Sequence, residues 1–164
     1  MEEMNTLKKV LRSYEAYYNV NRDTAKLPFV AEAVFRSHDE QFFLMRSVKL
    51  GEAESNEYVF FATSDHLDVG ELREFDEAAW SEGLARVKPH SNHRNTDITL
   101  VILGNTVTAE AFALVPQLQH YKSYRFGFQG WSHYRLIVLE ESSGRMAYNR
   151  QGQSLKKLFS NIFQ

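Results

Sequence analysis

Residues 98–103 constrain the fold of this chain more than any other segment. They read Ile, Thr, Leu, Val, Ile and Leu, the most apolar strand-like run in the sequence. Such a run is typical of a strand inside a sheet that is covered on both faces. Residues 58–62, which include two Phe and a Tyr, have the same unbroken apolar character. These two runs predict strands of a sheet with helices packed on it, and residues 98–103 are expected in the middle of that sheet.

Apolar residues at helical spacing predict a first helix over residues 4–18. The members of this stripe are Met4, Leu7, Leu11, Tyr14 and Tyr18. Asp68, followed by Glu71 at the spacing of a capping box, predicts the start of a second helix that ends near Pro89. Both helices are expected to pack on the sheet.

Two shorter helices are predicted in the second half of the chain. Thr108 is placed to cap a short helix, and Pro116 removes a backbone hydrogen bond and so ends or kinks it. Ser154 is placed to cap a final helix with another narrow apolar stripe. The polar residues 145–153 before that helix predict a surface turn, or alternatively an anion-binding loop at the helix N-terminus.

The remaining strands are predicted from aromatic and β-branched runs. Residues 29–35 and 42–48 flank a polar segment and predict a β-hairpin. In the last third of the chain, residues 124–128, 134–139 and 146–148 are separated by turn-forming residues, a pattern typical of an antiparallel meander.

Together these elements predict one α+β domain over residues 1–164. Their order is α-β-β-β-α-β-α-β-β-β-α, with a mixed β-sheet of about five to six strands and helices packed on it. No repeat, low-complexity tract or linker interrupts the sequence. A repeat protein or a second domain is therefore not expected.

The first seven elements follow the order of the restriction-endonuclease-like fold, a resemblance at fold level only. That fold implies an acidic residue near the end of the second strand and a Glu-x-Lys motif on the third. Here Glu57 is followed by Tyr58 and Val59, and the second predicted strand offers Arg46 and Lys49. The catalytic motif is absent, so the resemblance does not imply nuclease activity.

Composition excludes several classes of chemistry. The chain of 164 residues has no Cys, so it forms no disulfide, thiolate zinc site or thiol nucleophile. Its first five residues are acidic rather than basic and apolar, which argues against a secretory signal. The apolar runs are far shorter than a membrane span. The sequence therefore predicts a cytoplasmic protein without a membrane partner.

Charge is distributed unevenly along the chain. Residues 1–87 hold 10 Lys and Arg against 17 Asp and Glu, whereas residues 88–164 hold 9 against 4. Cations interleaved with aromatic residues can bind phosphates and stack on bases. We therefore predict a C-terminal surface for a phosphate-bearing ligand or nucleic acid. Its candidate residues are Lys122, Arg125, Trp131, Arg135, Tyr148, Arg150 and Gln153.

A second candidate site precedes the central strand. His90, His93 and Asp97 lie in a polar loop, and imidazole and carboxylate groups are ligands for Zn²⁺ or Mn²⁺. This spacing matches no established zinc signature. No other motif implies a cofactor, so a divalent metal is the one cofactor that the sequence suggests.

Three functional hypotheses follow. The favoured one is a non-catalytic binding or regulatory module that uses the basic, aromatic C-terminal surface. The alternatives are a metal-dependent enzyme that uses the His90, His93 and Asp97 loop, and a self-associating protein in which the acidic half of one copy complements the basic half of another. The residues alone leave open whether the chain is an enzyme.

Overall fold

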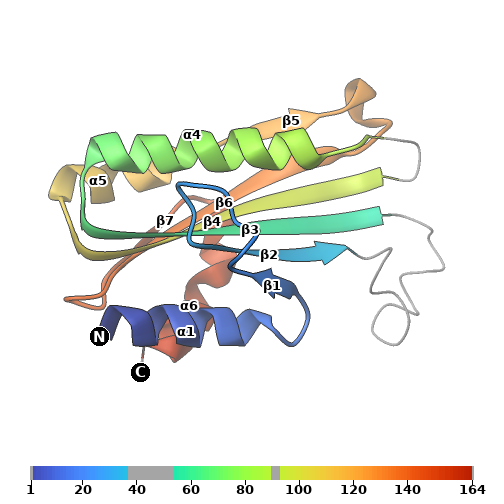
Figure 1. Ribbon diagram of the computed structural model, residues 1–164. Coiled ribbons are helices and arrows are strands. Elements are labelled where there is room, and N and C mark those ends of the chain that lie inside the picture. The colour runs from blue at the N-terminus through green and yellow to red at the C-terminus, as the bar shows by residue number, and fades with distance from the viewer. Residues whose placement is uncertain (1, 37–53, 90–92, 164) are drawn as a thin grey trace.

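The computed structural model describes residues 2–36, 54–89 and 93–163. These residues form a seven-stranded mixed sheet in the order β1-β2-β3-β4-β6-β5, with β7 paired to β6 (Figure 1). The strands are β1 (Asn19–Asn21), β2 (Ala31–Arg36), β3 (Glu54–Leu67), β4 (His93–Val107), β5 (Tyr121–Ser123), β6 (Trp131–Glu140) and β7 (Met146–Tyr148). β3, β4 and β6 are parallel, and the remaining pairs are antiparallel.

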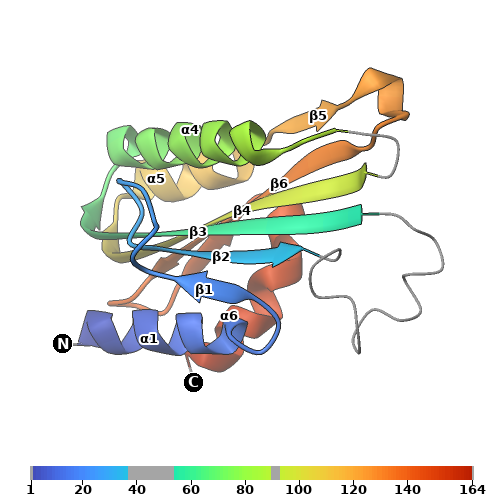
Figure 2. The same ribbon diagram turned by 45° about the vertical axis from the view of Figure 1, so that its right-hand side comes forward.

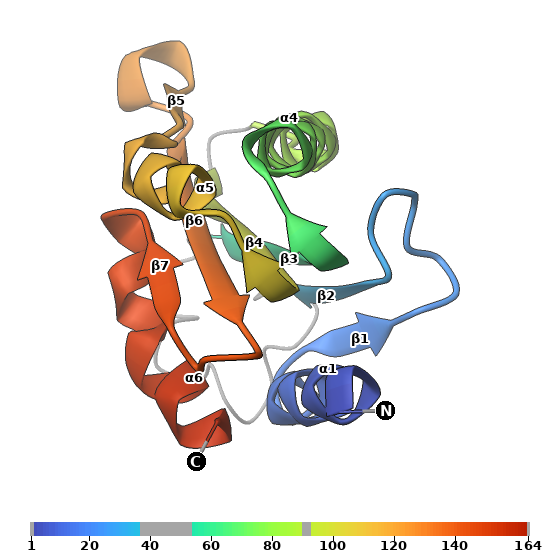
Figure 3. The same cartoon turned by 90° about the vertical axis from the view of Figure 1, so that its left-hand side faces the viewer.

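Helices cover both faces of this sheet. α4 (Val69–Arg86) and α5 (Ala109–Leu114) lie on one face, and α1 (Glu2–Tyr14) and α6 (Lys156–Ile162) lie on the other (Figure 3). Side chains alternate along each strand, so one strand contributes to both apolar layers. In β4, Leu100 packs in the layer under α4, whereas Val101 packs in the layer under α1 and α6. None of the described helices is long and apolar enough to cross a membrane.

A glycine sets the distance between α4 and the sheet. Gly83 lies in the last turns of α4, directly over the wholly buried side chain of Ile98 in β4. A Cβ atom at this position would lie 2.6 Å from two carbon atoms of Ile98. The absence of a side chain at Gly83 therefore permits the close packing of this helix on the central strand.

The predicted fold class and element order are confirmed. Two predicted caps are also present: Asp68 accepts a hydrogen bond from the Glu71 amide at 2.8 Å, and Thr108 accepts one from the Ala111 amide at 3.1 Å. α5 ends at Leu114, and a 3₁₀ turn that contains Pro116 follows it, as the proline predicts.

The prediction of a cap at Ser154 is wrong. A 3₁₀ helix, η3 (Gln151–Leu155), precedes α6, and the Ser154 hydroxyl donates to the Gln151 carbonyl at 3.2 Å. The buried side chain of Asn149 fixes this segment instead through four hydrogen bonds. Its side-chain oxygen accepts from the amides of Leu136 and Gly152, and its amide donates to the carbonyls of Leu118 and Tyr134. Through Asn149, the polar segment before α6 thus connects β6, the turn after Pro116 and η3.

Several strand predictions need correction. The first strand of the predicted hairpin, over residues 29–35, corresponds to β2. The second, over residues 42–48, lies outside the described residues, as do Arg46 and Lys49. The three-residue strand β1 is not in the prediction. Residues 124–128 do not form a strand, because residues 125–127 form a 3₁₀ turn and the strand lies before them as β5. The predicted antiparallel meander is present as β5, β6 and β7.

Candidate functional site

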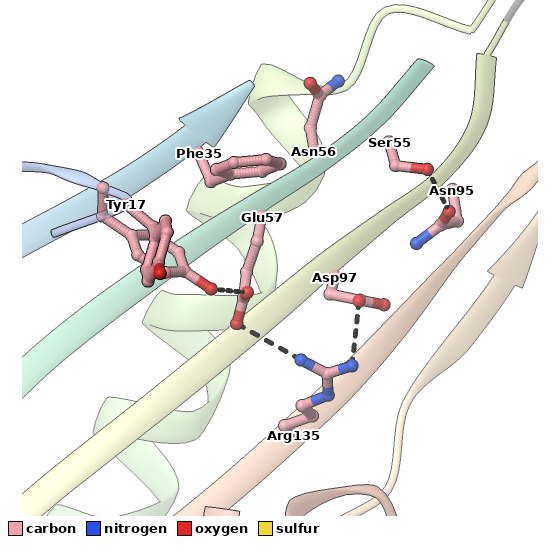
Figure 4. Close-up of a pocket in the computed structure, with 9 residues that line it drawn as sticks. Tyr17, Phe35, Ser55, Asn56, Glu57, Asn95, Asp97 and Arg135 are labelled. Carbon is pink, nitrogen blue, oxygen red and sulfur yellow. Dashed lines mark hydrogen bonds and ion pairs between the residues drawn. The ribbon is translucent and has the colours of Figure 1, made fainter. Parts of the chain in front are cut away.

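A cleft of about 490 Å³ opens on the face of the sheet that α1 and α6 cover in part. β2, β3 and β4 continue past the end of α1, so their outer ends are not covered by this helix (Figures 1 and 2). Side chains from this open part of the sheet and from the segment after α1 line the cleft (Figure 4). They are Tyr17, Tyr18, Phe35, Ser55, Asn56, Glu57, Asn95, Asp97 and Arg135.

Strand register brings the charged residues of the cleft together. Glu57 of β3 lies directly beside Asp97 of β4, and Arg135 of β6 lies beside Thr99 of β4. These positions alternate with the residues under α4, so they share a face with the apolar layer under α1 and α6. Where the two helices end, this face carries polar side chains instead of apolar ones.

Arg135 bridges the two carboxylates. Its Nη1 lies 3.3 Å from Oε2 of Glu57, and its Nη2 lies 3.0 Å from Oδ2 of Asp97 (Figure 4). Glu57 also accepts hydrogen bonds from the hydroxyl groups of Thr99, at 2.9 Å, and of Tyr18. Two carboxylates therefore face one guanidinium group, and the described side chains of the cleft carry an excess of negative charge when both carboxylates are ionised.

Burial dominates the electrostatics of Glu57. Its side chain is 11% exposed, and the loss of solvation raises the pKa of its carboxyl group above the ordinary value. The hydrogen bond from Tyr18 and the charge of Arg135 oppose this rise. The pKa of the Tyr18 hydroxyl is also raised, first by burial and then by the charge of Glu57. Tyr18 therefore acts as a proton donor in this hydrogen bond.

Aromatic rings form one wall of the cleft. The centre of the Tyr18 ring lies 5.7 Å from the centre of the Phe35 ring and 5.0 Å from that of the Tyr14 ring. The Tyr14 and Tyr18 rings meet edge to face. The Tyr14 hydroxyl is buried beside this wall and has no hydrogen-bond partner among the described residues. On the other side of the cleft, the Ser55 hydroxyl donates to Oδ1 of Asn95 at 2.9 Å. The cleft thus combines an aromatic wall, a charged floor and a polar rim.

A family described as "Domain of unknown function (DUF8052)" matches residues 2–161. The chain belongs to this family. Comparison with curated proteins and with solved structures gave no match. The match to DUF8052 includes every residue that lines the cleft.

The structure divides the basic, aromatic residues predicted for a C-terminal surface among three places in this DUF8052 domain. Lys122, Arg125 and Trp131 lie in or beside the turn between β5 and β6, whereas Arg135 lies in the cleft. The other three residues lie in β7 and around η3, and they are Tyr148, Arg150 and Gln153. A single surface built from all seven residues is therefore not formed.

The predicted metal ligands are only partly described. Asp97 lines the cleft and is paired with Arg135. His93 begins β4, but its side chain is outside the description, and His90 lies outside the described residues. Among the side chains that are described, no group of three or more His, Asp or Glu residues could hold a metal ion. The metal site stays a prediction.

Sequence reasoning missed Glu57 as part of a site, together with its aromatic neighbours. Glu57 and Arg135 are 78 residues apart, and no local pattern connects them. One signal was available: Glu57 directly precedes the apolar run 58–62, and Asp97 directly precedes the run 98–103. A carboxylate directly before the apolar run of each of two parallel strands indicates a paired site toward one end of the sheet.

Proposed function

We propose that this chain is a non-catalytic binding module and that its cleft binds a small organic cation, such as a primary amine or a guanidinium compound. The observation that carries this proposal is the charge balance of the cleft. Among the described residues that line the cleft, Glu57 and Asp97 face one cation, Arg135, beside a wall of aromatic rings. A cationic group of the ligand, placed beside Asp97, compensates the remaining negative charge.

Asp97 is the natural anchor for such a ligand. Both oxygens of Glu57 already accept hydrogen bonds, from Tyr18 on one side and from Thr99 and Arg135 on the other. Arg135 contacts one oxygen of Asp97, and the Asp97 side chain is 16% exposed. An ammonium or guanidinium group can therefore pair with Asp97 while the internal network stays intact.

The aromatic wall favours the same class of ligand. A cation over the face of a Tyr or Phe ring is attracted by the ring quadrupole, and the attraction grows when water is excluded. Tyr17, Tyr18 and Phe35 supply such rings, and Ser55 and Asn95 supply hydrogen-bonding groups for a neutral part of the ligand. The volume of about 490 Å³ lies within the usual range of small-molecule sites.

A phosphate-bearing ligand fits this cleft poorly, although Arg135 was one of its predicted contacts. A phosphate beside Arg135 would also meet the carboxylates of Glu57 and Asp97. The negative charges of the phosphate and the two carboxylates would repel each other, and this repulsion is strong where solvent is partly excluded. The remaining candidates for an anionic partner are the cations outside the cleft.

Isothermal titration calorimetry with agmatine, which carries both an amine and a guanidinium group, tests the proposal. We expect saturable binding near neutral pH, and we expect Asp97→Asn to weaken it by about tenfold or more, since one charge-assisted contact is lost. Glu77→Gln is the matched control: it removes the same charge from the exposed side of α4, on the opposite face of the sheet. It is expected to leave the affinity unchanged.

Two results would contradict the proposal. One is a folded wild-type protein that binds neither agmatine nor putrescine. The other is an Asp97→Asn variant that binds agmatine as tightly as the wild type. ATP serves as the anionic comparison, and tighter binding of ATP than of agmatine in the cleft would reverse the predicted sign of the ligand charge.

A further inference from the structure

β5 and the turn that follows it carry the most exposed aromatic residues of the described chain. Phe126 is 100% exposed, Phe128 is 84% exposed and Tyr121 is 60% exposed. We call residues 121–131 the aromatic knob. It projects past the end of α4, on the same side of the sheet as that helix (Figure 2). Large apolar side chains that are exposed together in one short segment indicate an interaction site.

The turn of the knob has an unfavourable backbone conformation. Arg125 and Phe126 have φ angles of 49° and 54°, a region that L-residues with large side chains rarely adopt. Backbone hydrogen bonds close the turn, including those from the amides of Gly127 and Gln129 to the carbonyl of Tyr124 at 3.0 and 3.1 Å. Strain of this kind persists where function requires a side chain in a fixed place. Here it holds the Phe126 ring in solvent.

The knob is also free of negative charge. No Asp or Glu occurs between Glu110 and Glu140, whereas the knob itself contains Lys122 and Arg125. The Lys122 ammonium lies 5.6 Å from the centre of the Tyr124 ring, so cations and rings share one surface. The partner that this chemistry fits is anionic at its surface and apolar beneath.

From this arrangement we propose that the aromatic knob inserts into the surface of a lipid bilayer that contains anionic lipids. Phe126 and Phe128 lie in the turn and suit the acyl boundary, whereas Tyr and Trp side chains prefer the interface. Lys122 and Arg125 can reach the headgroups from beside them. This proposal departs from the expectation of a protein without a membrane partner. That expectation rests on the lack of long apolar runs, and an interfacial contact needs no spanning segment.

A bilayer fits the knob better than a nucleic acid does. Single-stranded nucleic acids bind along extended grooves in which cations follow the backbone and several rings stack on successive bases. The knob is a short protrusion with two cations. Beyond the knob, His133 of β6 lies beside Asp97 of β4, so a nucleic-acid strand that continued along the sheet would approach the carboxylates of the cleft.

Vesicle co-sedimentation with the full chain tests this proposal. We expect binding to vesicles of phosphatidylcholine mixed with phosphatidylglycerol, and binding weaker by about tenfold or more to phosphatidylcholine alone. Phe126→Asn is expected to reduce binding to the mixed vesicles by about tenfold or more, since an inserted ring is lost. The same variant is expected to unfold at a higher temperature than the wild type, because Asn tolerates a positive φ angle better than Phe.

Two further variants sharpen the test. Leu27→Ser removes an equally exposed apolar side chain, one that is 93% exposed outside the knob, and should leave vesicle binding unchanged. Lys122→Glu should abolish the preference for the mixed vesicles over phosphatidylcholine alone.

The proposal is overturned if the folded wild type fails to bind mixed vesicles, or if Phe126→Asn and Leu27→Ser reduce binding equally. Binding of oligothymidylate that Phe126→Asn abolishes, without vesicle binding, would assign the knob to nucleic acid instead. Agmatine binding is a separate measurement, so failure of the cleft proposal leaves this result unaffected.

Discussion

Glu57 is the residue on which the electrostatics of the cleft depend. Tyr18, Thr99 and Arg135 contact its carboxylate, and Asp97 adds a like charge in the adjacent strand. Burial is the largest influence and raises its pKa. The folded state therefore holds the Glu57 proton more tightly than the unfolded state does.

This pKa shift gives a prediction about stability and pH. A raised pKa in the folded state means that the contribution of Glu57 is fully present below its unfolded pKa and is lost as pH rises through its folded pKa. We expect the free energy of unfolding of the wild type, relative to that of Glu57→Gln, to fall as pH rises through this window. Urea denaturation of both proteins at a series of pH values measures it.

Glu140 provides a control of opposite sign. Its pKa is lowered, first by the hydrogen bond from Ser143, with help from the Val107 amide and Arg145. Its contribution is therefore present above the unfolded pKa and lost as pH falls, so a comparison with Glu140→Gln should slope the other way. Equal slopes for the two variants would contradict the assignment of the raised pKa to Glu57.

At the level of elements, the packing of α4 against β4 depends on Gly83. Replacing Gly with Ala inside a helix usually stabilises it by about 0.5–1 kcal/mol. Here the added Cβ would lie 2.6 Å from the buried Ile98 side chain, and overpacking of a core costs about 1–3 kcal/mol. We expect Gly83→Ala to lower the free energy of unfolding by about 1–2 kcal/mol.

Chemical denaturation of Gly83→Ala measures this effect, and a double-mutant cycle with Ile98→Ala tests its cause. Ile98→Ala removes all three carbon atoms that a Cβ at position 83 would meet, so Gly83→Ala should cost less in that background than in the wild type. A Gly83→Ala variant as stable as the wild type, or more stable, would show that α4 moves away from the sheet without cost.

The elements that could be predicted from sequence are those with a strong local pattern. The runs 58–62 and 98–103 predict buried strands because both faces are apolar, and Asp68 and Thr108 predict helix starts because their side chains accept amide hydrogen bonds. Ser154 failed as a cap because η3 continues the helical path before α6.

The short elements and the site could not be predicted in the same way. β1 and β5 have three residues each, too few to show a period. The strand expected over residues 124–128 is a turn because Arg125 and Phe126 adopt positive φ angles. Residues other than glycine rarely adopt such angles, so the sequence gives no sign of this turn. The cleft depends on the register of β3, β4 and β6, and register is a property of the folded sheet rather than of a local sequence.

For the molecule as a whole, stability is expected to concentrate in the three parallel strands. β3, β4 and β6 lie between the two helical layers, whereas the residues of β5 are exposed and those of β1 are exposed or half-buried. Regions with few buried apolar contacts open with low free energy. Native-state hydrogen exchange should therefore show the slowest amides in the centre of β3, β4 and β6 and fast exchange in β1 and β5.

The knob gives the sharpest case of this prediction. Backbone amides of the knob are hydrogen-bonded within the turn, whereas its side chains are exposed. Local opening should therefore expose these amides to exchange without unfolding of the sheet. Protection in β5 as strong as in the centre of β4 would show that the β5–β6 hairpin belongs to the cooperative core.

The first and the last helix of the fold share one task. α1 and α6 contact each other and together cover the side chains of Val101, Leu103, Ile137 and Leu139. During synthesis, α1 leaves the ribosome before the central strands, so its apolar face has no partner within this domain until those strands follow. This layer closes only when residues 156–162 have left the exit tunnel, so a nascent chain that pauses before them keeps an apolar surface open to chaperones.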